Sequence, residues 1–114
     1  MKIAALFAAA LIGAGTPAAA RASTSYWSVA KVLRWIDGVQ IRVGTRRVRL
    51  DGETTLCSGQ GVSVRRAGVR RWRHFACTYT MFTRGLVDRD LDFRLHVLSA
   101  TRFSVTDAHW VRGR

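Results

Sequence analysis

Five arginines stand between residues 65 and 73, and a tryptophan and a histidine are interleaved with them. The arginines are Arg65, Arg66, Arg70, Arg71 and Arg73, and the interleaved residues are Trp72 and His74. A guanidinium group binds phosphate or carboxylate through paired hydrogen bonds, and a neighbouring indole ring can stack on a sugar or base. The cluster therefore predicts an anion-binding site. One alternative stays open, in which these arginines form ion pairs on a solvated loop with Asp88, Asp90 or Asp92.

Those three aspartates resemble the opening of a calcium-binding loop, in which alternate positions supply carboxylates. Such a loop needs glycine at the position of Phe93 and glutamate at the position of Ser99. Both requirements fail, so the spacing excludes this calcium site.

Catalytic motifs are not evident in the chain. Ser58 lies in Cys57-Ser58-Gly59-Gln60-Gly61, which differs from the small-Ser-small turn of hydrolases. No HExxH pattern and no phosphate-binding loop occur, and any two of the seven acidic residues could be named as a glycosidase pair. We therefore expect a protein that is not an enzyme and that has no cofactor and no metal.

The first residues have the pattern of a secretory signal peptide. Lys2 precedes an apolar run from Ile3 to Ile12, and Ala18-Ala19-Ala20 or Ala20-Arg21-Ala22 offers a cleavage site. The apolar run is shorter than the roughly 20 residues that a membrane-spanning helix needs. We expect residues 1–22 to be a signal peptide and residues 23–114 to be a single domain. The mature chain would then have no transmembrane segment and would be secreted or periplasmic.

Two cysteines, Cys57 and Cys77, remain after such a cleavage. A small exported domain with an even number of cysteines most simply pairs them, because its compartment is oxidising. We therefore expect a disulfide between Cys57 and Cys77.

The chain is strongly basic, with 19 lysines and arginines against 7 acidic residues and a net charge of +12. A positive field attracts nucleic acid, anionic lipid surfaces and acidic polymers. Export argues against intracellular nucleic acid as a partner and favours an anionic envelope polymer or lipid surface. The abundance of arginine and alanine and the absence of asparagine are also what a GC-rich coding sequence produces, so compositional bias is a second explanation of the charge.

The hydrophobic pattern predicts one helix followed by strands. A stripe at helical spacing predicts a helix from Ser25 to Asp37, capped by Ser23, Thr24 or Ser25 and ended by Gly38. Alternating residues then predict strands at these places: 39–43, 48–50, 54–58, 69–81, 90–98 and 102–110. Residues 59–68 are expected to be a loop or loose hairpin, and residues 82–89 a connection.

The alternation also predicts how the longest strands pair. Opposing Tyr79 to Leu91, Cys77 to Phe93 and Phe75 to Leu95, and then Leu95 to Val105 and Val97 to Phe103, places the large apolar residues on one face. A slip of one residue would turn polar side chains into the core. The fold class is therefore α+β, with one N-terminal helix packed on an antiparallel sheet of four to five strands and one disulfide.

The same register predicts what the opposite, polar face carries. It places Trp72, His74, Ala76 and Thr78 there, with His74 opposite His96. Two histidines alone make a weak metal site, and we expect this pair to be solvated.

Two resemblances accompany this pattern. The segment from Trp72 to Thr106, with Arg73-His74-Phe75-Ala76-Cys77 and Phe93-Arg94-Leu95-His96-Val97-Leu98, resembles small secreted single-disulfide α+β bacterial proteins of unassigned function. The helix-then-strands order is similar to cystatins, and Gln40-Ile41-Arg42-Val43-Gly44 is similar to their Gln-x-Val-x-Gly loop with the valine displaced by one residue. The second resemblance concerns topology, and protease inhibition is not transferred.

These observations together predict an exported binding module whose site is the arginine cluster with Trp72. The alternative is a protein-interaction or inhibitor module that uses an edge strand or a sheet face to bind a protein partner.

Overall fold

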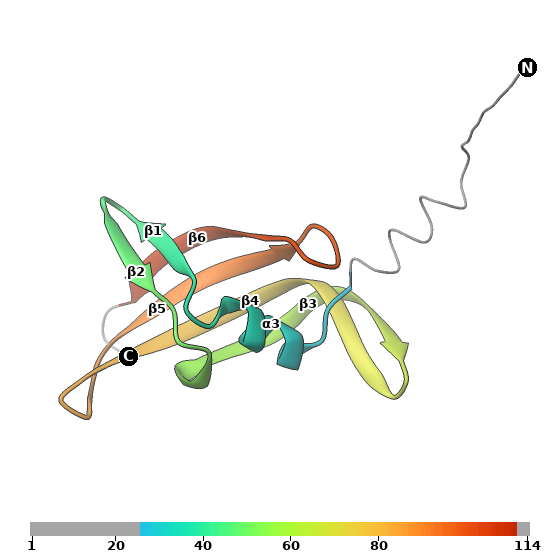
Figure 1. Cartoon of the computed structure of the whole chain (residues 1–114), viewed down its shortest axis with the longest axis horizontal. Coiled ribbons are helices and arrows are strands. Elements are labelled where there is room, and N and C mark those ends of the chain that lie inside the picture. The colour runs from blue at the N-terminus through green and yellow to red at the C-terminus, as the bar shows by residue number, and fades with distance from the viewer. Residues whose placement is uncertain (1–25, 112–114) are drawn as a thin grey trace, which may run out of the picture.

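The computed structural model describes residues 26–111 (Figure 1), and the predicted signal peptide lies outside them. Helix α3 is followed by a short hairpin, a 3-10 helix and four long strands. In chain order the elements are α3 (Val29–Ile36), β1 (Gln40–Val43), β2 (Arg46–Arg49), η1 (Gly52–Thr54), β3 (Thr55–Arg66), β4 (Val69–Thr83), β5 (Leu86–Val97) and β6 (Phe103–Val111).

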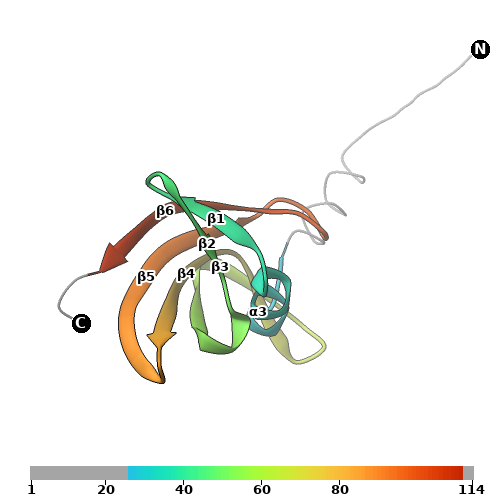
Figure 2. The same cartoon turned by 60° about the vertical axis from the view of Figure 1, so that its left-hand side comes forward.

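The four long strands form one antiparallel sheet in the order β3-β4-β5-β6, and β1 and β2 form a separate two-stranded sheet. The long sheet is strongly curved, and α3 and the β1–β2 hairpin lie on the same side of it (Figure 2). Helix α3 contacts β3, and β1 contacts β6. The predicted α+β class, with one helix packed on antiparallel strands, is therefore confirmed.

The hydrophobic core lies between the long sheet and these covering elements. Phe75 pairs with Leu95, Cys77 with Phe93 and Tyr79 with Leu91, as the alternation predicted. The predicted pairs of β5 with β6, Leu95 with Val105 and Val97 with Phe103, are also present. Burial of each large apolar side chain contributes about 1.5–3 kcal/mol, so this register is strongly favoured over a slipped one.

Helix α3 begins later than the pattern predicted. Its N-cap is Ser28, whose hydroxyl accepts a hydrogen bond from the Lys31 amide at 3.2 Å. The predicted start at Ser25 is wrong because Trp27 is extended and exchanges two backbone hydrogen bonds of 2.8 Å with Trp72 of β4. The caps suggested at residues 23–25 lie outside the described residues. The predicted end at Gly38, which has a φ of 81°, is confirmed.

Two segments expected to be connections are instead parts of long hairpins. The β3–β4 turn consists of Ala67 and Gly68, and the β4–β5 turn consists of Arg84 and Gly85. All four residues have positive φ, as tight hairpin turns require. The connection predicted at 82–89 is wrong. Of the two alternatives for 59–68, the hairpin is present and the loop is wrong, because register shifts in the strands absorb the breaks in alternation that suggested loops.

A disulfide joins Cys57 of β3 to Cys77 of β4, as predicted. The two residues are direct partners across the strands. The bond closes a loop with a sequence separation of 20 residues, which contributes about 3 kcal/mol in the chain-entropy account.

Trp72 packs against the core rather than on the polar face predicted for it. Its ring meets Phe75 edge-on with the ring centres 6.0 Å apart, and it occupies the space where Gly59 lacks a Cβ. A register shift between Gln60 and Ser63 adds a residue to β3 beside it. Such a bulge increases the local twist, and the side chain turns inward over Gly59.

This packing predicts that Gly59→Ala destabilises the domain by about 2 kcal/mol, since the new methyl group would overlap the Trp72 ring. Urea unfolding of the disulfide-bonded protein measures the loss. The neighbouring Ser58→Ala is the control, and its exposed side chain predicts a change within about 0.5 kcal/mol. Equal stability of the two variants would contradict the packing of Trp72.

Candidate functional site

The arginine cluster predicted from the sequence lies at the end of a regular β-hairpin. Arg65 pairs with Arg70, Val64 with Arg71 and Arg66 with Val69, on either side of the Ala67–Gly68 turn. The structure therefore brings together on two adjacent strands the five predicted arginines, which we call the arginine hairpin: Arg65, Arg66, Arg70, Arg71 and Arg73.

Neutral groups contact several of these arginines. Arg65 donates to the Gly68 carbonyl oxygen at 3.3 Å, and Arg70 donates to the Ser63 hydroxyl at 2.8 Å. The Arg73 guanidinium lies 5.9 Å from the centre of the Tyr26 ring. Such contacts orient a guanidinium group without cancelling its charge.

The three aspartates considered as ion-pair partners lie on a different part of the sheet. Their oxygens accept hydrogen bonds from threonine hydroxyls of β4: Asp92 from Thr78 at 2.7 Å, Asp90 from Thr80 at 2.9 Å and Asp88 from Thr83 at 3.3 Å. Thr78 stands five residues beyond Arg73 along β4, a backbone separation of about 16 Å. Strand geometry therefore places these aspartates away from Arg73 and from the arginines nearer the turn.

Lys31 of helix α3 lies within the electrostatic field of Arg71. The Lys31 ammonium donates to the Ala100 carbonyl oxygen at 2.7 Å and lies 4.6 Å from the centre of the Trp27 ring and 5.4 Å from that of Trp35. Burial lowers the pKa of Lys31 below its ordinary value of 10.5, and the positive charges of Arg71 and Arg34 lower it further.

Arg71 has a buried hydrogen-bond donor that is not satisfied. Its Nε atom is buried and has no hydrogen-bond partner among the described residues. A buried donor without an acceptor costs free energy, which an anion placed against the guanidinium would recover. Lys31 and Arg34 escaped the sequence analysis because they are distant from Arg71 in the chain, and tertiary contacts such as the backbone pairing of Trp27 with Trp72 bring the two segments together.

The β1–β2 hairpin carries another basic surface that the sequence analysis did not single out. Arg42 pairs with Arg47, Val43 with Arg46 and Gln40 with Arg49, and all four arginines are exposed. The sequence contains a signal for this surface, because Arg42, Arg47 and Arg49 alternate with the inward residues Ile41, Val43 and Val48. This surface supplies a natural comparison for the arginine hairpin.

The histidine pair is placed as predicted. His74 lies opposite His96, and their Nδ1 atoms are 2.9 Å apart. The Nε2 atom of His96 also contacts the Thr106 hydroxyl at 2.8 Å. Among residues 26–111 no group of three or more histidine, cysteine, aspartate or glutamate side chains is arranged to hold a metal ion.

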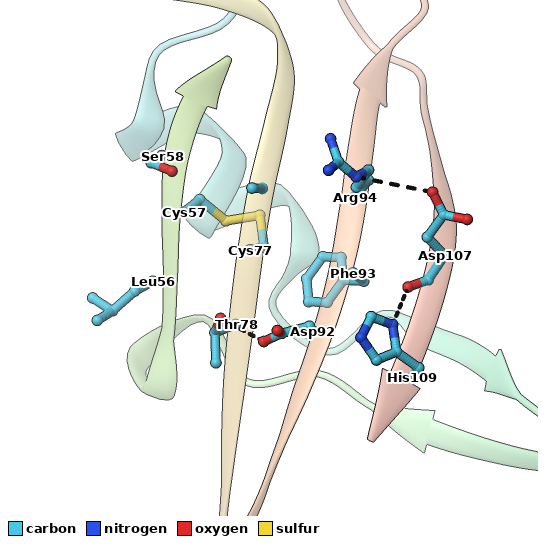
Figure 3. A pocket seen from close by; sticks show the side chains of 11 residues that line it. Leu56, Cys57, Ser58, Cys77, Thr78, Asp92, Phe93, Arg94, Asp107 and His109 are labelled. Carbon is cyan, nitrogen blue, oxygen red and sulfur yellow. Dashed lines mark hydrogen bonds and ion pairs between the residues drawn. A yellow bond between two sulfur atoms is a disulfide. The ribbon is translucent and has the colours of Figure 1, made fainter. Parts of the chain in front are cut away.

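The polar face of the sheet contains an open cavity of about 370 Å³ that spans β3 to β6 (Figure 3). Its ionisable side chains are engaged locally. Asp92 accepts from Thr78, Arg94 lies 3.9 Å from Asp107, and His109 Nδ1 lies 2.8 Å from the Asp107 carbonyl oxygen. The hydroxyl of Ser58 accepts from Gln60 at 3.2 Å rather than contacting a base. The cavity is large enough to hold a small polar group.

Comparisons with protein-family models, with curated proteins and with solved structures gave no match to this chain. No helix among residues 26–111 is long and apolar enough to cross a membrane.

The cation group predicts a measurable coupling between Lys31 and Arg71. Arg71→Gln should raise the pKa of Lys31, because it removes a positive charge that disfavours the protonated ammonium. An NMR titration of the Lys31 side chain follows this pKa, and Lys31 is the one lysine after residue 2. Arg42→Gln is the matched control and should leave the pKa unchanged. A pKa that is the same in wild type and Arg71→Gln would refute the coupling.

Proposed function

We propose that this chain is an exported, non-enzymatic binding module that recognises an anionic polymer of the cell envelope, bearing phosphate or carboxylate groups, through the arginine hairpin. The observation that carries the proposal is the placement of five arginines on two paired strands, where the buried Nε of Arg71 lacks an acceptor among the described residues and the charge of Arg71 lowers the pKa of Lys31. A bound anion would supply the acceptor and offset the charge of Arg71.

Polymer binding suits the shape of this surface. Arginines on two antiparallel strands form rows about 5 Å apart, and neighbours on one face of a strand repeat about every 7 Å. Guanidinium groups spaced in this way can meet several charged groups of one chain, and each contact can be bidentate. Helix α3 extends the basic surface through Lys31 and Arg34.

Export is supported by the signal-like pattern of residues 1–22 and by the Cys57–Cys77 disulfide, which an oxidising compartment maintains. In that compartment an envelope polymer is available to the hairpin, whereas intracellular nucleic acid is not. The proposal that the protein is non-enzymatic draws support from the cavity of the polar face, where Ser58, Asp92 and Asp107 are engaged by Gln60, Thr78 and Arg94.

A second candidate function is the binding of a protein partner along β3. This strand is an edge of the long sheet, and it exposes Leu56 and Val62 to 79% and 74%. An edge strand offers unpaired backbone groups to an extended segment of a partner. The salt dependence of the binding affinity distinguishes the two functions. The affinity of an apolar and backbone-mediated contact depends weakly on ionic strength, whereas that of polymer binding through several arginines depends on it steeply.

The proposal predicts that replacing three exposed arginines of the hairpin, Arg65, Arg70 and Arg73, by glutamine weakens binding to an anionic polymer at least about tenfold at low salt. The matched control replaces Arg42, Arg46 and Arg47 of the β1–β2 hairpin, which removes the same charge from another exposed surface. The control should lose less than about threefold, since it removes only long-range attraction.

Polyphosphate of defined length is the probe, and calorimetry over a range of salt concentrations gives the affinities. Equal losses in the two variants would show that net charge alone attracts the polymer and would sink the proposal. A protein partner captured from envelope extracts and retained at high salt would favour the edge-strand function.

A further inference from the structure

The β4–β5 hairpin ends in a tip that exposes large apolar side chains. Phe82, Leu86 and Val87 are exposed to 49%, 74% and 61%, on either side of the Arg84–Gly85 turn. We call these three residues the apolar tip. Both turn residues have positive φ, 55° and 78°, as in the tight turn that suits the twist of a hairpin. The tip is therefore a structured element whose apolar surface faces solvent.

The side chains of the apolar tip project to both sides of the hairpin. Phe82 pairs with Val87, whereas Leu86 pairs with Thr83 at the adjacent position. Neighbouring pairs of a hairpin project to opposite sides of the strands, so apolar groups occur on both sides of the tip. A docking partner with a flat surface would cover one side. An apolar medium that surrounds the tip would cover both.

Basic and aromatic residues lie on both sides of the apolar tip, in its turn and where the hairpin joins the body of the domain. Arg84 is in the turn itself, and the Arg89 guanidinium lies 4.0 Å from the centre of the Trp110 ring. Asp88, the acidic residue closest along the chain, accepts a hydrogen bond from Thr83 at 3.3 Å. Arginine and tryptophan beside exposed Phe, Leu and Val form the pattern of proteins that bind at the lipid–water interface.

We propose that the apolar tip inserts into the surface of an anionic phospholipid bilayer. Phe82, Leu86 and Val87 would enter the boundary between headgroups and acyl chains. Arg89, on the body side of the tip, would meet lipid phosphates, and the long side chain of Arg84 would extend back from the turn to reach them. The positive net charge of the chain would draw it to such a surface. This site is separate from the arginine hairpin, which lies at the opposite end of the long sheet (Figure 1). A domain bound in this way would direct the arginine hairpin away from the bilayer.

Vesicle binding tests the insertion. The disulfide-bonded secreted protein, shown by mass spectrometry to lack residues 1–22, is sedimented with vesicles of phosphatidylcholine alone or mixed with phosphatidylglycerol. Phe82→Ser with Leu86→Ser removes apolar surface from the tip. Leu56→Ser with Val62→Ser is the matched control, because those residues of β3 are at least as exposed.

Wild type and the β3 control should bind the anionic vesicles equally, whereas the tip variant should bind at least about tenfold more weakly. Circular dichroism checks that each variant is folded. Three results would overturn the inference: unchanged binding by the tip variant, an equal loss in the β3 control, or no sedimentation of wild type with anionic vesicles. A wild-type dimer that the tip variant converts to a monomer would also overturn it, because a second copy would then cover the tip.

The polyphosphate affinity of the tip variant should equal that of wild type, so the insertion into vesicles can be disproved without affecting the proposal for the arginine hairpin.

Discussion

The register of β4 against its two neighbours is the constraint on which the rest of the structure depends. The Cys57–Cys77 disulfide joins β4 covalently to β3, and Phe75 against Leu95 sets its alignment with β5. A slip of one residue would place charged side chains of β5 in the core. Because β4 is the longest strand, its two ends project as hairpins, and these ends carry the two surfaces proposed to bind ligands. The same pairing that buries the core thus separates the arginine hairpin from the apolar tip.

The N-terminal segment adds a second constraint by joining helix α3 to the beginning of β4. Trp27 is fully buried, exchanges backbone hydrogen bonds with Trp72, and donates from its indole nitrogen to the Ser99 carbonyl oxygen at 3.0 Å. This attachment brings Lys31 into the field of Arg71. Cations held together in a folded protein destabilise it unless binding energy offsets the repulsion, and such sites are therefore candidates for ligand binding.

Much of this arrangement could be predicted from the sequence, because strand alternation and the cysteine pair are local or pairwise signals. The register of β4 with β5, the disulfide and the end of the helix at Gly38 were predictable for that reason. The helix start was missed because a distant strand binds Trp27, which overrides the local helical pattern. The orientation of Trp72 depends on a bulge in β3, which alternation within β4 does not reveal. The meeting of Lys31 with Arg71 likewise depends on tertiary contacts, whereas the cluster of arginines along β3 and β4 is visible in the sequence itself.

The claim that a specific basic site, rather than diffuse charge, binds an anion is tested most directly by NMR of arginine side chains. The Nε–Hε signals of the secreted, disulfide-bonded protein would be followed during a titration with polyphosphate. The Arg71 signal, whose nitrogen lacks an acceptor among the described residues, should shift and saturate together with those of the other four arginines of the arginine hairpin. Arg42, Arg46 and Arg47 should shift later and weakly. Equal shifts from both hairpins at every polyphosphate concentration, or an unmoved Arg71 signal, would contradict the account.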